Sequence, residues 1–127
     1  MLHNLFLLVN ESGISIGNLN FSEEKLDDIE ADLLSSSIKG IIDFFNSTPF
    51  GEIDTFKFMD KSMKIIRKEQ LMYVLVYDKD TDMMLYNSKL EMIAEMFENC
   101  IDWCSWYGNV SQFKDLLNDA KQLLIED

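Results

Sequence analysis

The sequence predicts an α/β domain of the mixed α+β kind, in which helices cover a five-stranded antiparallel sheet. Residues 5–9 and 71–77 are apolar at every position, which is typical of strands buried on both faces. One long segment of helical spacing lies between these runs, and two more follow the second run. The expected order is strand, strand, helix, strand, strand, strand, helix, helix, in one domain spanning residues 1–127.

The opening segment is predicted to form a β-hairpin. Residues 5–9 run into the turn residues Glu11, Ser12 and Gly13, and a second strand is expected over about residues 14–19. Gly13 can take the positive φ that a tight turn requires.

Residues 28–46 are predicted to form the first long helix, which ends before Pro49 and Gly51. Ser22-Glu23-Glu24 offers a start, and the expected apolar stripe consists of Ile29, Leu33, Ile38, Ile41, Ile42 and Phe45. The interior is unusual in carrying Ser35, Ser36, Ser37 and Gly40, since glycine costs about 1 kcal/mol relative to alanine within a helix. Tight packing on the helix's own sheet is the favoured explanation. The alternative is a helix contact in a dimer, through Ser36, Ser37 and Gly40.

Three further strands are expected over residues 52–59, 62–67 and 71–77, with turns at Asp60-Lys61 and Glu69-Gln70. In the first of them Phe56 and Phe58 alternate with polar residues, as in a sheet with one face toward helices. The first and fifth strands are apolar on both faces and therefore belong at the centre. This predicts the order 2-1-5-4-3, with strands two and three at the edges.

Two C-terminal helices complete the predicted fold. Apolar residues recur every three or four positions over residues 83–104, and Thr81 or Asp82 would cap this helix. Ser88 with Glu91 forms an alternative capping box, which would start the helix later and leave residues 83–86 extended. Gly108 ends it, and a closing helix is expected to bury Val110, Phe113, Leu117, Ala120 and Leu124.

Composition limits the classes of function. Hydrophobic residues make up 47% of the 127 residues, which excludes a disordered chain. The net charge of -12 argues against nucleic-acid binding and against direct attraction to acidic membranes. A signal peptide and an apolar run of about 20 residues are both missing. We therefore expect a cytoplasmic protein with no transmembrane segment, whose membrane association, if any, is peripheral and runs through partners.

Residues for catalysis or metal binding are sparse. His3 is the only histidine, and the sequence has no glycine-rich phosphate loop and no combination of serine, histidine and aspartate that suggests a triad. Cys100 and Cys104, four residues apart, are expected to share a helix face as small core residues. The acids of residues 78–82 lack the glycine and glutamate of a calcium loop and are interpreted as a helix start. The sequence predicts no enzyme, no cofactor and no metal.

Two groups of residues are candidates for partner binding. Lys57, Lys61, Lys64, Arg67 and Lys68 lie within twelve positions and are opposed only by Asp60, so this window carries +4 and the rest of the chain -16. They predict a basic patch for an acidic partner surface or a lipid headgroup, and the alternative is that edge-strand lysines block aggregation. Trp103 and Trp106 are the second group, with core packing as the favoured alternative.

The order of elements and several stretches resemble the longin and roadblock superfamily, and the longin branch in particular. The matching stretches are residues 5–14, the serine-rich helix around residues 34–45, and residues 73–78. Longin domains open on the hairpin, whereas roadblock domains place a helix before it. The resemblance implies a non-enzymatic platform for small GTPases or for trafficking and scaffold complexes. Many such domains pair through the first long helix and an edge strand.

The leading functional hypothesis is therefore a longin-like interaction module that forms homo- or heterodimers and binds a small GTPase or a GTPase-regulatory or membrane-trafficking complex. A second hypothesis is a small-molecule sensor of profilin-like or PAS-like type, with a ligand among Phe44, Phe56, Tyr73 and Trp103. A third is a vesicle-coat adaptor subunit.

Overall fold

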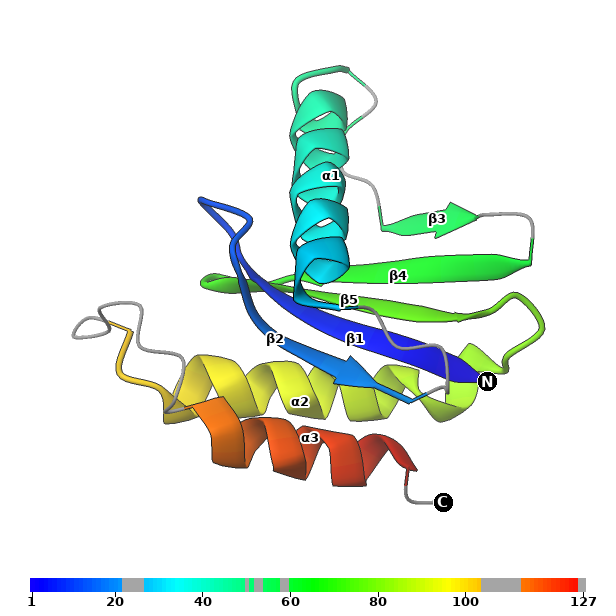
Figure 1. The fold of residues 1–127 in the computed structure, drawn as a ribbon, viewed down its shortest axis with the longest axis vertical. Helices are drawn as coiled ribbons and strands as arrows, with labels where there is room; N and C mark the ends of the chain where they lie inside the picture. Colours follow the sequence, from blue (N-terminus) through cyan, green and yellow to red (C-terminus); the bar gives the residue numbers. More distant parts are fainter. Residues whose placement is uncertain (22–26, 50, 52–53, 58–59, 104–112, 126–127) are drawn as a thin grey trace.

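Five antiparallel strands form the sheet at the centre of the computed structural model (Figure 1). The structure describes residues 1–21, 27–49, 51, 54–57, 60–103 and 113–125. The strands are β1 (Leu2–Val9), β2 (Ser15–Asn20), β3 (Thr55–Lys57), β4 (Lys61–Arg67) and β5 (Leu71–Asp78). Their order across the sheet is β2-β1-β5-β4-β3, which confirms the predicted fold class and topology.

Helices cover both faces of this sheet. The helix α1 (Asp28–Asn46) crosses the strands on one face, and α2 (Asn87–Cys100) and α3 (Lys114–Ile125) lie side by side along the other (Figure 1). A short 3-10 turn, η1 (Met83–Leu85), leads into α2. The result is three layers with the sheet in the middle.

The two central strands are buried on both sides because each contributes alternate side chains to two apolar clusters. In β1, Leu5 and Leu7 pack toward α2 and α3, whereas Phe6 and Leu8 pack toward α1. All residues of β5 from Leu71 to Tyr77 are buried. Burial of apolar side chains on both faces is the main reason that β1 and β5 pair at the centre.

The predicted hairpin turn and first helix form as expected from their local sequence. Gly13 has a φ of 74°, and its N–H donates to the Val9 carbonyl at 2.8 Å. The helix α1 has the predicted bounds, but its cap is Asp27, whose carboxylate accepts from the Glu30 N–H at 2.7 Å while the Glu30 carboxylate accepts from the Asp27 N–H. The start predicted at Ser22-Glu23-Glu24 lies outside the described residues.

Several predicted boundaries shift. The first strand begins at Leu2 rather than at residue 5, because the buried Asn4 finds partners: its side-chain amide donates to Asn18 and Asn20 at 3.2 and 2.7 Å. In the described residues β3 covers only Thr55–Lys57; residues 52–53 and 58–59 of the predicted strand lie outside them.

The helix predicted over residues 83–104 is instead a 3-10 turn followed by a shorter helix. Asp82 caps η1 by accepting from the Met84 N–H at 3.0 Å. The helix α2 begins at Asn87, so the alternative that left residues 83–86 outside the helix has the right boundary, whereas a start at Thr81 or Asp82 is wrong. The cap position is Tyr86, which makes no side-chain cap, rather than Ser88, and residues 83–85 form the 3-10 turn rather than an extended segment. It ends at Cys100, because Ile101 takes an extended backbone with φ -105° and ψ 135°. Phe113, just before α3, and Ala120 and Leu124 within it are buried as predicted. Leu117 is half-buried, and Val110 lies outside the described residues.

Candidate interaction surface

The helix α1 carries apolar side chains on two opposite faces. Ala31, Ile38 and Ile42 are buried against the sheet. Three residues predicted to share that stripe are instead exposed: Ile29 at 72%, Leu33 at 65% and Ile41 at 41%. At 3.6 residues per turn these three project away from the sheet, together with Phe44, which is 64% exposed. The prediction of one continuous buried stripe was wrong because it merged the two faces.

Small residues occupy the middle of this outward side. Ser36, Ser37 and Gly40 are exposed, and a Cβ added at Gly40 would meet nothing within 4 Å. The favoured explanation, tight packing of these residues on the helix's own sheet, is therefore wrong, and of the predicted small residues only Ser35 is buried. We call the following set the outer face of α1: Ile29, Leu33, Ser36, Ser37, Gly40, Ile41 and Phe44.

The outer face of α1 has a near-symmetric arrangement of sizes along the helix. Large side chains stand toward both ends, Ile29 and Leu33 at one and Ile41 and Phe44 at the other, with small residues between them. A two-fold antiparallel pairing would place the Ile29 end of one helix against the Phe44 end of the other. The small residues would then lie near the crossing, where they allow the two backbones to approach closely.

The strand β3 is an outer strand of the sheet. Its central residue, Phe56, packs into the same apolar cluster as Ile38 and Ile42, whereas Thr55 and Lys57 are exposed. Figure 1 shows β3 at the edge of the sheet. The outer face of α1 is an exposed apolar surface, and among the described residues β3 has a paired strand on one side only.

The five predicted basic residues do not form one patch. The pairs Thr55↔Lys64 and Lys57↔Ser62 put Lys57 and Lys64 on the sheet face toward α2, and Lys68 joins them through an ion pair with Glu91 of α2 at 2.8 Å. Lys61 and Arg67 alternate to the α1 face along with the buried Met63 and Ile65. Three of the five basic residues therefore lie on the sheet face toward α2, and the other two lie on the face toward α1.

The described residues give Trp103 a packing role at the end of α2. Its ring stacks on Phe113 with centroids 5.6 Å apart, and its indole N–H donates to the Phe97 carbonyl at 3.2 Å. These contacts match the core-packing alternative for Trp103. Trp106 lies outside the described residues.

The small-molecule pocket predicted among four aromatic residues does not form between them. Phe44 projects outward from α1 and Phe56 packs on the α1 side, whereas Tyr73 and Trp103 belong to the cluster on the α2 side. A groove of about 490 Å³ lies elsewhere, at the ends of β1, β2, α2 and α3. Its lining includes Leu2, Phe21, Leu85, Tyr86 and Leu124.

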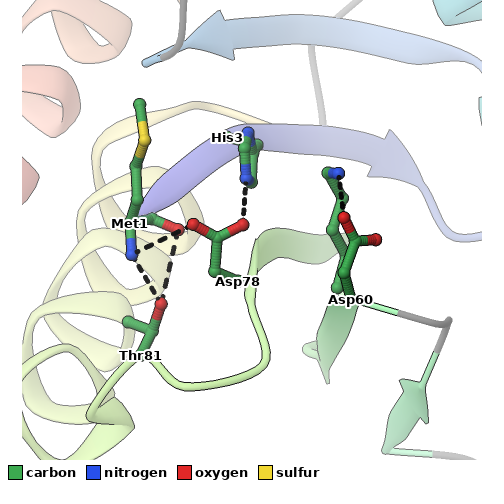
Figure 2. A network of polar contacts seen from close by, with 6 residues as sticks. Met1, His3, Asp60, Asp78 and Thr81 are labelled. Atoms are coloured by element: carbon green, nitrogen blue, oxygen red, sulfur yellow. Dashed lines mark hydrogen bonds and ion pairs between the residues drawn. The ribbon is translucent and has the colours of Figure 1, made fainter.

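A polar network fastens the start of β1 to the end of β5. Figure 2 shows the Asp78 carboxylate between the His3 ring, at 2.6 Å, and the Met1 amine, at 3.7 Å, while that amine also donates to the Thr81 hydroxyl at 2.7 Å. The hydrogen bond from His3 is the largest cause that lowers the pKa of Asp78. Asp60 pairs with Lys61 on the neighbouring strand end, at 3.3 Å.

A second network joins α2 to the turn between β4 and β5. The Tyr73 hydroxyl donates to the Glu98 carboxylate at 3.1 Å, and the other carboxylate oxygen accepts from the Gln70 N–H at 2.7 Å. Burial, followed by the charge of Glu98, raises the pKa of Tyr73. The hydroxyl therefore stays protonated and acts as a structural donor.

Within the described part of the chain no three side chains of the metal-ligating types His, Cys, Asp and Glu come together. Cys100 is exposed at the end of α2, so the expectation that it is a core residue was wrong, and Cys104 lies outside the described residues. The described helices also include none with the length and apolarity needed to cross a membrane.

The most distinctive surface is therefore the outer face of α1, and the β3 edge is a second candidate for contact with a partner. Sequence reasoning pointed to Ser36, Ser37 and Gly40 but missed the large residues around them, although plotting the helix at 100° per residue would have separated the two apolar faces. Comparison of the chain with protein-family models and with curated proteins finds no match.

Proposed function

We propose that this chain is a non-enzymatic protein-interaction module, longin-like in its architecture, that acts in the cytoplasm and pairs with a second copy or a relative through the outer face of α1. The observation that carries the proposal is the apolar character of that face. Among the described residues, four of the ten exposed large hydrophobic side chains belong to it: Ile29, Leu33, Ile41 and Phe44. An exposed apolar patch of this kind on a folded domain is typical of a protein-binding surface.

The free energies involved favour a dimer whose interface includes more than the outer face of α1. Burying the exposed large side chains of two such faces contributes on the order of 10 kcal/mol. Association itself costs roughly 4–15 kcal/mol in lost translational and rotational freedom. The helix face alone therefore gives a weak pair, and the β3 edge, which is paired on one side only, is a surface that can add hydrogen bonds to it.

The pairing is tested by sedimentation velocity over a concentration series, at about 0.5 M NaCl to screen the net charge. Wild type is expected to form a dimer. Leu33→Glu should abolish it, since a buried carboxylate would face apolar side chains without a partner. Met92→Glu is the matched control, because Met92 is 52% exposed but lies on α2. A dimer that survives Leu33→Glu would contradict the proposal.

Gly40→Ala supplies a second variant that does not add charge. The new methyl meets nothing within the chain, so helix propensity should raise the free energy of unfolding of the monomer by up to about 1 kcal/mol. The same methyl enters the expected helix crossing and should weaken the dimer. Thermal unfolding and sedimentation of the same samples separate the two effects.

We further propose that the paired module serves as a platform for a small GTPase or for a membrane-trafficking complex. This part is supported by the architecture: a mixed α+β fold with sheet order 2-1-5-4-3 and the first long helix exposed. Purified small GTPases, each loaded with GDP or with a non-hydrolysable GTP analogue, provide the test by biolayer interferometry. Binding that Leu33→Glu reduces would support the platform, and a panel without any binding would contradict it.

The groove of about 490 Å³ keeps a small-molecule sensor as a second candidate function. Its volume lies within the range of ligand sites, and its lining is mainly apolar. A ligand that binds only the folded state raises the melting temperature. A thermal-shift screen with apolar metabolites, compared between wild type and Leu85→Asp, tests this candidate independently of pairing.

A further inference from the structure

The β3 edge has backbone groups available for an added strand. The Asp54 carbonyl accepts from the Ile65 N–H at 2.8 Å, which makes these two residues a hydrogen-bonded pair of the antiparallel ladder. Because bonded and non-bonded pairs alternate, the N–H and C=O groups of Phe56 face β4 and those of Thr55 and Lys57 face away from the sheet. An extended strand from a partner can bond to these outward groups.

The side chains at this edge are positively charged on one face. Lys57 and Lys64 lie on the sheet face toward α2, diagonally adjacent on neighbouring strands. Within the described residues neither lysine has an ion pair at 4.0 Å or less. Asp54 alternates to the opposite face, together with Phe56. We call the line along which an added strand would pair with β3 the seam. On the sheet face toward α2 this seam is basic, although the chain as a whole carries a net charge of -12.

A second copy of this chain fits that seam poorly. β3 has three described residues, so a two-fold pairing that uses all of them is centred on Phe56 and sets Lys57 of each copy opposite Thr55 of the other. Both copies of Lys57 and Lys64 would then share one face across the seam. The two copies of Lys57 would be diagonal neighbours across the seam, about 7–8 Å apart and within reach of each other's long side chains, so their charges repel. Acidic residues farther away are screened beyond about 10 Å in ordinary buffers.

We infer that the natural partner at this edge is a different protein, whose edge strand carries aspartate or glutamate opposite Lys57 or Thr55, on the sheet face that also holds Lys64 of the next strand. The inference rests on the proposed pairing through α1 and deepens it by naming the charge of the partner. The outer face of α1 supplies apolar area to any pair. The basic edge selects among partners, because it repels a second copy and attracts an acidic strand.

A charge-swapped copy of the chain serves as the acidic partner. Wild type and Lys57→Glu/Lys64→Glu are labelled separately, and the affinities of the two homotypic pairs and of the mixed pair are measured by fluorescence anisotropy. At about 0.05 M NaCl the mixed pair is expected to bind about tenfold more tightly than either homotypic pair. At about 0.5 M NaCl the difference should shrink to less than about threefold, because screening removes it.

The matched control is Lys114→Glu/Lys121→Glu, which changes the net charge equally but at two exposed positions of α3. Its mixture with wild type should bind no more tightly than wild type alone. Lys64 is half-buried, so the single variant Lys57→Glu, at an exposed position, is measured in parallel and should shift the affinity in the same direction by a smaller factor.

The outcomes separate this inference from the proposed function. If wild type pairs at high salt but the mixed pair gains nothing at low salt, or if the α3 control gains as much, the acidic-partner inference is wrong and pairing stands. If no combination pairs at either salt concentration, the proposed pairing is wrong and the inference fails with it.

Discussion

At the scale of single residues, Asp78 shows how one charge can hold two chain segments together. Its carboxylate accepts a hydrogen bond from His3 of β1 at 2.6 Å, and its backbone N–H donates to the Met1 carbonyl at 2.9 Å. The lowered pKa of Asp78 means that its carboxylate ionises more readily in the folded state than in the unfolded state, so ionised Asp78 stabilises the fold. The start of β1, which the apolar pattern placed at residue 5 rather than at Leu2, is thus held in place partly by polar contacts.

Asp78→Asn should change the pH dependence of stability. Because the folded pKa is lowered, the contribution of Asp78 is fully present above its unfolded pKa of about 3.9 and is lost as the pH falls through the folded value. Wild type should therefore have the higher melting temperature near neutral pH, and the gap to Asp78→Asn should close on acidification below about pH 4. A gap that stays constant between neutral and acidic pH would contradict the role given to this carboxylate.

At the scale of elements, Gly17 and Gly40 differ in the space that surrounds them. Gly17 of β2 lies against α3: a Cβ added there would lie 2.7 Å from Cδ2 and 3.0 Å from Cδ1 of Leu117. Gly40 of α1 has open space instead. The first glycine allows the chain to pack on itself, and the second leaves room on a surface that we assign to another chain.

Gly17→Val should destabilise the fold by about 1–3 kcal/mol, because the added methyl groups force Leu117 and α3 away from β2. Urea unfolding of Gly17→Val, Leu117→Ala and the double variant forms a cycle that measures the coupling. The double variant should lose less stability than the two single changes added together. Strict additivity would show that Leu117 does not limit the space at Gly17.

At the scale of the whole molecule, charge and apolar surface oppose each other. The net charge of -12 keeps copies of the chain apart, whereas the outer face of α1 favours their association. Repulsion between exposed charges is screened by salt, but apolar burial is not. The balance makes the oligomeric state a function of ionic strength.

Self-association of wild type should therefore strengthen by about tenfold between roughly 0.05 and 0.5 M NaCl, measured as the dimer dissociation constant by sedimentation equilibrium. Leu33→Glu should remain monomeric across the whole range. A dimer that weakens with added salt would show that attraction between charges, rather than the apolar face, drives association.

Local pattern was enough to predict the element order and the sheet order, because β1 and β5 are apolar at nearly every position and must be covered on both sides. Boundaries set by polar contacts were not predictable in this way. Asn18 and Asn20 of the paired strand accept from Asn4 and help to extend β1, and residues 14 and 16 positions apart in sequence meet in this way only in the folded sheet.

The candidate surface was also predicted only in part from the sequence. The small residues Ser36, Ser37 and Gly40 stood out in the sequence, but their side of the helix did not, because Ile29, Leu33 and Ile41 repeat with the same spacing as the buried Ile38 and Ile42. The lysines likewise cluster in sequence and separate in space, since successive residues of a strand point to opposite faces.

The sequence by itself determined that the chain is acidic, the order of its strands and long helices, and the pairing of its two most apolar strands, all of which follow from periodicity and composition. Only the tertiary structure decided which of the two apolar sides of α1 the sheet covers. One helix can bury a single side against one sheet, and the residues left outside are known only once the helix has been placed.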